Sequence, residues 1–133
     1  MAVSDGADWI LRSMVDMASS DGRLDSREIS LIQKVYLDQS GRSLTADEVA
    51  NAGQENVKGG NMLDQLAAVA PGLDRDTKEE IIRASYLVLL ADDRIAGEER
   101  KRLQDIAAAL QVPEIHFGAI LEDLAIWLVQ QKQ

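Results

Sequence analysis

The chain has 133 residues, which is enough for one hydrophobic core but too few for two independent cores. Hydrophobic residues make up 46% of the chain but aromatic residues only 4%, a composition that favours packed helices over sheets. The formal net charge is -9, so the long-range field repels phosphate backbones and we expect no nucleic-acid partner.

The absence of cysteine excludes disulfides, thiolate metal sites and a cysteine nucleophile, and it suits a reducing compartment. The N-terminal sequence "MAVSDGADW" has neither the basic nor the apolar region of a secretory signal. The longest purely apolar run, "YLVLLA" from Tyr86, is far shorter than the roughly 20 residues that span a bilayer. We therefore expect a cytoplasmic protein without membrane insertion.

Two helices are predicted before residue 41. Apolar residues spaced three and four apart, among them Ile10, Met14 and Met17, predict an amphipathic helix over about 8–20. Asp25 and Glu28 have the spacing of a capping box, which predicts that a second helix begins near Ser26; Gly41 ends it. The two helices form a hairpin around the acidic stretch "DGRLDSRE".

Three helices follow. Thr45 and Glu48 form a second capping box before the segment "VANAGQENV", which ends at the glycines of "VKGGN". A short helix over "NMLDQLAAVA" ends at "PG", and we expect Asp76 and Glu79 to cap the next helix, "IIRASYLVLLA". Apolar residues cover nearly the whole circumference of that helix, so we expect it to be the central one.

The last two helices complete an all-α fold. Leu103, Ile106 and Leu110 mark the sixth helix, and Pro113 suits the first turn of the seventh. Apolar residues of the seventh helix, from Phe117 to Leu128, recur at spacings of three, four and seven, which predicts a face that closes the core. Packing of the first helix against the last would bury both Trp9 and Trp127, and we expect each to be an anchor of the core or of an interface. We predict a single-domain bundle of about seven helices over residues 1–133.

One unit occurs twice in the chain. When "DGRLDSREI" is placed over "DDRIAGEER", Asp21 aligns with Asp92, and Glu28 aligns with Glu99 at the same offset. Leu24 falls on Ile95, and we expect each to plug its turn against the core. Apolar helix positions on both sides of the turn keep this offset, which predicts two pseudo-symmetric helical hairpins.

The doubled pattern of an apolar helix, the motif D-G-x-(I/L)-x-x-x-E and a second helix resembles the TerB-like family, named for a tellurite-resistance protein. The resemblance covers residues 8–123. It implies an all-helical fold, usually of seven helices, and a link to stress and metal-ion responses without an established catalytic activity. In the second copy, Asp93 stands where the family has Gly, and Ala96 stands opposite Asp25.

The resemblance also implies that the acidic turns bind a divalent cation. The residues that match are Asp21, Gly22, Glu28, Asp92 and Glu99, and Asp25 adds a carboxylate to the first turn. Their oxygen ligands fit Ca²⁺, Mg²⁺ or Mn²⁺, although the spacing excludes an EF-hand. The alternative is structural, because Gly22 suits a positive φ while Asp25 and Glu28 cap the second helix.

No enzymatic motif is present. His116 is the only histidine, and no G-x-S-x-G, H-E-x-x-H or P-loop pattern occurs, so we expect an ordinary surface or half-buried side chain and no enzyme. Two functions remain. One is a non-enzymatic TerB-like domain of the tellurite-resistance or stress-response type, with weak cation binding through the acidic turns. The other is a protein-protein interaction module, with a homodimer among the alternatives, in which those turns are purely structural.

Overall fold

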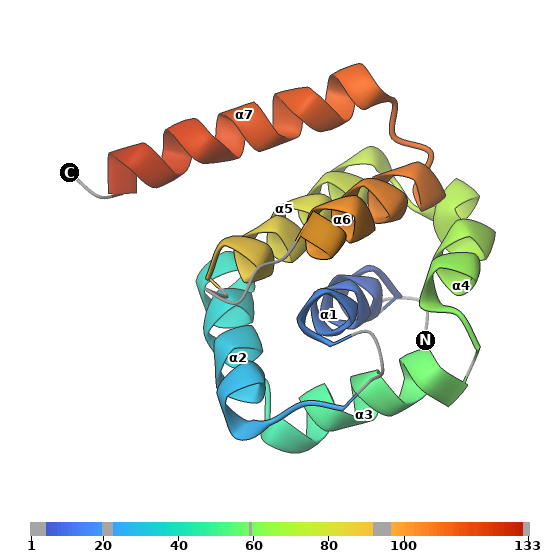
Figure 1. The fold of residues 1–133 in the computed structure, drawn as a ribbon, viewed down its shortest axis with the longest axis vertical. Coiled ribbons are helices and arrows are strands. Elements are labelled where there is room, and N and C mark those ends of the chain that lie inside the picture. Colours follow the sequence, from blue (N-terminus) through green and yellow to red (C-terminus); the bar gives the residue numbers. More distant parts are fainter. Residues whose placement is uncertain (1–4, 20–22, 59, 92–96, 132–133) are drawn as a thin grey trace.

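The computed structural model describes residues 5–19, 23–58, 60–91 and 97–131, and within these ranges the chain is all-α, as predicted. It has seven α-helices and one short 3-10 turn (Figure 1). Their bounds are α1 Asp5–Ala18, α2 Ser26–Ser40, α3 Ala46–Lys58, α4 Met62–Val69, the 3-10 turn η2 Ala70–Gly72, α5 Arg75–Ala91, α6 Gly97–Ala109 and α7 Glu114–Gln131.

Helix α1 lies at the centre of the bundle. Figure 1 shows it enclosed by the other helices of the body, and it contacts α2, α3, α4, α5 and α6. Every residue from Leu11 to Met17 is buried. The prediction that α5 is the central helix is therefore wrong. Apolar residues surround α5 because it has contacts on two sides, with α1, α2 and α6 in the body and with α7 outside it, while Leu90 and Ala91 at its end are exposed.

The predicted caps of α2 and α3 are confirmed. The Asp25 carboxylate accepts a hydrogen bond from the Glu28 N–H at 2.7 Å, and Glu28 accepts one from the Asp25 N–H at 3.0 Å. Thr45 and Glu48 form the same reciprocal pair. Gly41 ends α2 at φ 75°, a left-handed conformation that glycine adopts without a Cβ clash. Local sequence signals thus determine these helix ends.

The predicted cap of α5 is wrong. The residue that accepts the hydrogen bond from the Thr77 N–H is Asp74, at 2.7 Å, and Asp76 lies in the first turn of the helix. The Thr77 side chain and backbone both donate to Asp74, and these hydrogen bonds hold the pKa of Asp74 below its usual value. Asp74 and Asp76 both have a residue suited to a cap three positions later, so the sequence offered two competing starts.

Helix α7 packs on the outside of the bundle, against α5 (Figure 1). Ile120 and Leu124 are buried, and Phe117 and Leu121 are partly buried against the core. The prediction that α1 packs against α7 and buries both tryptophans is wrong, because α5 lies between these helices. Trp9 is buried at 8% exposure, whereas Trp127 is 40% exposed.

The order of helices agrees with two hairpins, α1 with α2 and α5 with α6, and their pseudo-symmetry stays a prediction. Leu24 is half-buried against the core, as expected of a plug in its turn, while Ile95 lies outside the described residues. Within the described ranges, no helix combines the length and the apolar character that crossing a membrane requires.

Candidate functional site

The first acidic turn is described only in part. Asp21 and Gly22 lie outside the described residues. Asp25 is exposed and Glu28 half-buried, and both carboxylates are engaged in the capping box of α2. The box holds these two predicted ligands next to each other, and this geometry is the one that the structural alternative requires. It neither uses nor excludes a cation.

The second acidic turn cannot be placed. Asp92 lies outside the described residues, and so does Asp93. Glu99 belongs to the first turn of α6, but the position of its side chain is not described. Among the side chains that are described, no group of three or more His, Asp or Glu residues is arranged to hold a metal ion. The cation site at the acidic turns therefore stays a prediction.

A buried polar cluster that sequence reasoning missed joins α1 to α3 and α4. Arg12, only 6% exposed, donates from Nε to the Asn56 side-chain oxygen at 2.9 Å and also bonds the Gln65 side chain. Asn56 donates back to the Arg12 carbonyl oxygen at 2.9 Å, and the guanidinium lies 4.2 Å from the centre of the Trp9 ring. Amide oxygens and an aromatic face thus stabilise a buried cation.

Asp16 continues this face of α1 one turn further. Its side chain is 2% exposed, and both of its oxygens accept hydrogen bonds from Arg102 of α6, at 2.5 and 2.7 Å. These bonds raise the pKa of Arg102, so its guanidinium stays charged at neutral pH. We call Arg12, Asp16 and their partners the polar seam. A signal was available, because Arg12 and Asp16 stand four residues apart in a mostly apolar part of α1, which places them on one face.

His116 ties the start of α7 to α5. Its Nε2 lies 3.0 Å from the Glu79 carboxylate, which also accepts from Arg75 at 3.1 Å. Burial acts to raise the pKa of Glu79, but the hydrogen bonds from His116 and Arg75 and the charges of His116 and Arg83 outweigh it, and the pKa is lowered. His116 is half-buried, as predicted, and its observed contact is one between helices.

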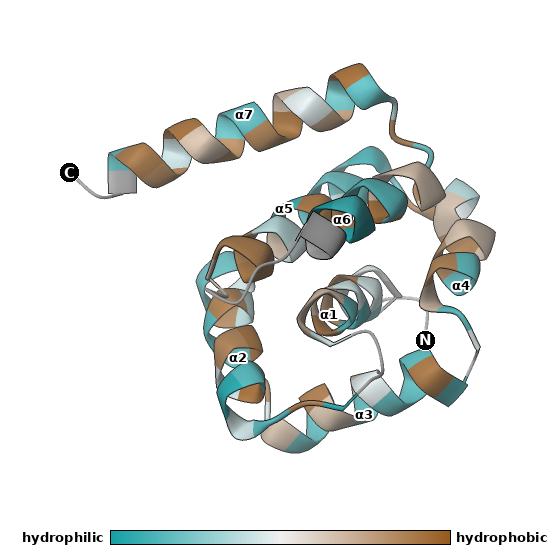
Figure 2. Ribbon diagram, in the orientation of Figure 1, coloured by the Kyte–Doolittle hydropathy of each residue, from teal (hydrophilic) through white to brown (hydrophobic). Residues whose placement is uncertain are grey.

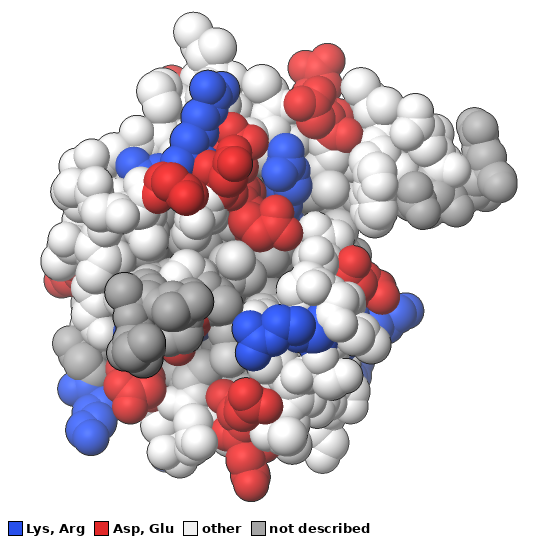
Figure 3. Space-filling model, turned by 180° about the vertical axis from the view of Figure 1, so that it is seen from behind, with Lys and Arg blue, Asp and Glu red and all other residues white. Residues whose placement is uncertain are grey.

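The outer face of α7 carries apolar side chains without a partner within the described chain. Ile115 is 90% exposed, Ile126 52% and Val129 58%, and the last part of the helix projects beyond the bundle (Figure 1). Figure 2 shows hydrophobic residues along most of α7, and Figure 3 shows the projecting end, at the right of that view, without charged side chains on the visible face. The helix therefore has an inner apolar face that packs on α5 and an outer one that meets solvent.

The exposed residues of this outer face follow a regular order. They are Ile115, Ala119, Glu122, Ile126 and Val129, spaced four, three, four and three residues apart. This is the 3.5-residue spacing of a seam between two packed helices. We call these five residues the exposed α7 stripe. A large apolar patch on a soluble protein commonly marks an interaction site.

An apolar groove of about 590 Å³ lies beside the stripe, between α2, α5 and α7. Its lining includes Leu31 and Val35 of α2, Leu87 and Leu90 of α5, and Trp127 of α7. A half-exposed tryptophan beside an apolar groove is a typical anchor of protein interfaces. Groove and stripe together make this end of the molecule suited to receiving another helix.

Taken together, these features define an all-helical domain with a buried polar seam and an exposed apolar helix. The chain matches the family model described as "Tellurite resistance protein TerB" over residues 10–122, so it belongs to the TerB family. Neither the curated proteins nor the solved structures that were searched contain a match to it.

Proposed function

We propose that this TerB-family chain is a non-enzymatic interaction domain that binds a helix of another protein along the exposed α7 stripe. The observation that carries the proposal is the heptad-type spacing of the five solvent-exposed residues of the α7 stripe, four of which are apolar. Burying an Ile or Val side chain contributes about 1.5 to 3 kcal/mol, so a helix that covers Ile126 and Val129 would gain most of its affinity there. Trp127 and the neighbouring groove add an anchor at the same end.

The charges of α7 favour a basic partner. Apart from His116, which contacts Glu79, its ionisable residues are acidic, namely Glu114, Glu122 and Asp123, and the whole chain has a net charge of -9. A second copy would place Glu122 against an acidic stripe of the same kind, which like-charge repulsion disfavours. A helix with lysine or arginine beside an apolar stripe complements both the shape and the charge. We therefore take such a helix, and not a second copy, as the occupant.

A pair of labelled synthetic peptides tests this proposal. Both form an amphipathic helix with leucine at the seam positions; one has lysine on its flanks and the other glutamate. Fluorescence anisotropy should show that the lysine peptide binds the chain and that the glutamate peptide binds about tenfold or more weakly. The double variant Ile126→Gln with Val129→Gln should weaken binding of the lysine peptide by at least about tenfold.

Val57→Gln is the matched control, because Val57 is 53% exposed on α3, away from α7, and its loss should change nothing. Equal weakening by the control and the α7 variants would contradict the proposal. Sedimentation equilibrium adds a second arm: a dimer of the parent that the double variant converts to monomer would make a second copy the occupant and overturn the proposal of a basic partner.

Cation binding at the acidic turns is the second candidate. What supports it is the match to the TerB family, because the resemblance to that family implies a cation at the acidic turns; the capping box, which keeps the carboxylates of Asp25 and Glu28 adjacent at the start of α2, is compatible with it. A cation at 100 times its dissociation constant should raise the melting midpoint by roughly 5 to 12 °C. Asp21→Asn should abolish the rise seen with Ca²⁺, Mg²⁺ or Mn²⁺, while Asp47→Asn, in the first turn of α3, should not. A midpoint that no cation shifts would contradict this candidate.

A further inference from the structure

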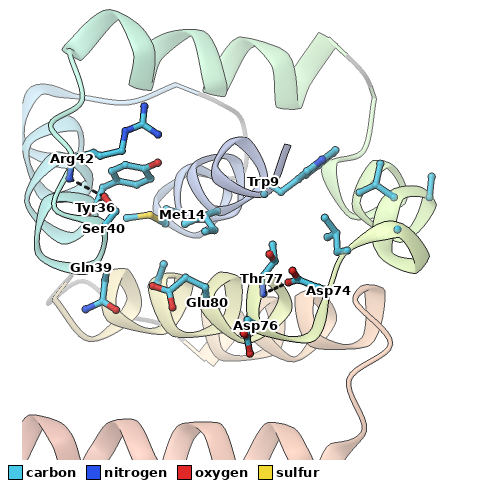
Figure 4. A pocket seen from close by; sticks show the side chains of 17 residues that line it. Trp9, Met14, Tyr36, Gln39, Ser40, Arg42, Asp74, Asp76, Thr77 and Glu80 are labelled. Carbon is cyan, nitrogen blue, oxygen red and sulfur yellow. Dashed lines mark hydrogen bonds between the residues drawn. The ribbon is translucent and has the colours of Figure 1, made fainter. Parts of the chain in front are cut away.

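A pocket of about 1010 Å³ opens on a different part of the molecule from the exposed α7 stripe. Figure 4 shows it between the first half of α1, the end of α2, η2 and the start of α5. Ile10 and Met14 of α1, Val69 of α4 and Ala84 of α5 give it an apolar lining. The volume is at the upper end of the range for small-molecule sites, about 300 to 1000 Å³.

Tyr36 places a polar group in this pocket. The residue is only 4% exposed, and Figure 4 shows its hydroxyl directed toward Met14, into the pocket. Among the described residues the hydroxyl has no hydrogen-bond partner. A hydroxyl in this position can donate a hydrogen bond to a ligand that enters the pocket.

The charges of the pocket are separated. On the α2 side, Arg42 extends beside the Tyr36 ring, and its guanidinium has no ion-pair partner within the described chain (Figure 4). On the α5 side, Asp76 and Glu80 stand four residues apart on one helix face, where like charges repel. The contact of Glu80 with Arg83 is long, at 3.8 Å. Hydrogen-bond donors therefore line one side and carboxylate acceptors the other.

We propose that this pocket binds an elongated organic zwitterion. Its ammonium group lies at Asp76 and Glu80, its carboxylate accepts hydrogen bonds from Arg42 and the Tyr36 hydroxyl, and its apolar body covers Met14. Two kinds of molecule have this chemistry. One is a long-chain amino acid whose amine and carboxylate stand at opposite ends of the chain, and the other is a short peptide with free termini. A cation alone or an anion alone satisfies only one side of the pocket.

The test uses the fluorescence of Trp9, which lines the pocket. Trp127→Phe leaves Trp9 as the only tryptophan, because the chain has two. The emission of this variant is titrated with 8-aminooctanoate and, as matched ligands that lack one charge, with octylamine and octanoate. We expect saturable binding of 8-aminooctanoate. Octylamine and octanoate should each bind at least about tenfold more weakly, because each loses a charge-assisted contact. Tri-leucine is the peptide arm, and whichever zwitterion binds more tightly identifies the source.

Two nearly isosteric variants test the assigned contacts. Glu80→Gln should weaken 8-aminooctanoate about tenfold, and Tyr36→Phe should weaken it about two- to tenfold, since only a hydroxyl is removed. Glu55→Gln, at an exposed position of α3 outside the pocket, is the control and should have no effect, and unchanged melting midpoints establish that the variants are folded. The proposal is overturned if no zwitterion gives a saturable response, if octylamine or octanoate binds equally well, or if both pocket variants bind like the parent.

Discussion

Helices α1 and α7 reverse the usual relation between polarity and burial. Helix α1 buries Arg12 and Asp16, two charged residues, in the middle of the bundle, whereas α7 exposes Ile115, Ile126 and Val129 to solvent. In α1 each charged group has partners on neighbouring helices. In α7 only one of two apolar faces has a neighbour within the described chain. Burial therefore depends on the available partner and not on hydropathy alone.

This contrast separates stability from function within one chain. The polar seam fixes how α3, α4 and α6 meet α1, so changes there should alter folding. The exposed α7 stripe contributes little to the core, so changes there should alter binding and leave folding intact. The predictions below follow this division, in order of decreasing effect.

The largest effect is expected for the ion pair of Asp16 and Arg102. Arg102→Gln leaves the Asp16 carboxylate, 2% exposed, without its partner, and should lower the free energy of unfolding by about 3 to 5 kcal/mol. Asp16→Asn leaves Arg102, whose side chain is 28% exposed and can reach water, and should cost only about 1 to 2 kcal/mol. Urea unfolding followed by circular dichroism measures both. Equal losses would show that the burial of Asp16 does not determine the cost.

A smaller loss is expected at the other end of the polar seam. Asn56→Ala removes two hydrogen bonds to Arg12, and the free energy of unfolding should fall by about 2 kcal/mol because the buried guanidinium keeps only its remaining partners. Asn51→Ala, at an exposed position of the same helix, should change it by less than about 0.5 kcal/mol. Similar values for the two variants would contradict the role assigned to Asn56.

The two faces of α7 should differ in a comparable way. Leu124→Ala, at a buried position, should cost about 2 kcal/mol, at the low end for a core leucine because the projecting helix can relax around the cavity. Ile126→Ala should leave the free energy of unfolding within about 0.5 kcal/mol of the parent. Thermal melting of both variants checks this. A large loss for Ile126→Ala would show that the outer face supports the fold.

The smallest effect concerns pH. Because the pKa of Glu79 is lower in the folded chain than its ordinary value of 4.5, its stabilising contribution is complete above that pH and is lost as the pH falls through the folded value. Partly exposed ion pairs of this kind contribute about 1 kcal/mol or less. Glu79→Gln should therefore flatten the decline of the melting midpoint below about pH 4.5, whereas Glu114→Gln should not. Parallel declines for the parent and Glu79→Gln would contradict this assignment.

Local chemistry explains what could be predicted from sequence. The capping boxes at Asp25 and Thr45 and the glycine end of α2 depend on residues at most three or four positions apart, so their patterns were sufficient. The choice between Asp74 and Asp76 could not be made this way, because both spacings fit. The position of α1 at the centre depends on contacts with five helices, which no single segment encodes.

The sites show the same limit. The capping role of Asp25 and Glu28 was visible in the sequence, whereas the predicted cation ligands also include Asp21 in the first turn and Asp92 and Glu99 in the second, whose side chains are not described. The seventh helix was predicted to close the core, and its inner face does so in part. The exposed outer face of α7 was not predicted. A helix that is apolar on two sides shows the same helical periodicity as one with a single packed face, so the pattern does not reveal the second face.

The attachment of α7 through α5 has a consequence for hydrogen exchange. A helix held by one neighbour opens without the rest of the molecule, since few buried contacts are broken when it detaches. Amide protons of α7 should therefore exchange through a low-energy local opening, while those of α1 exchange only when the whole bundle unfolds. Protection of the α7 amides on adding the lysine peptide would then report occupancy directly, as slower isotope uptake in one helix against an unchanged background.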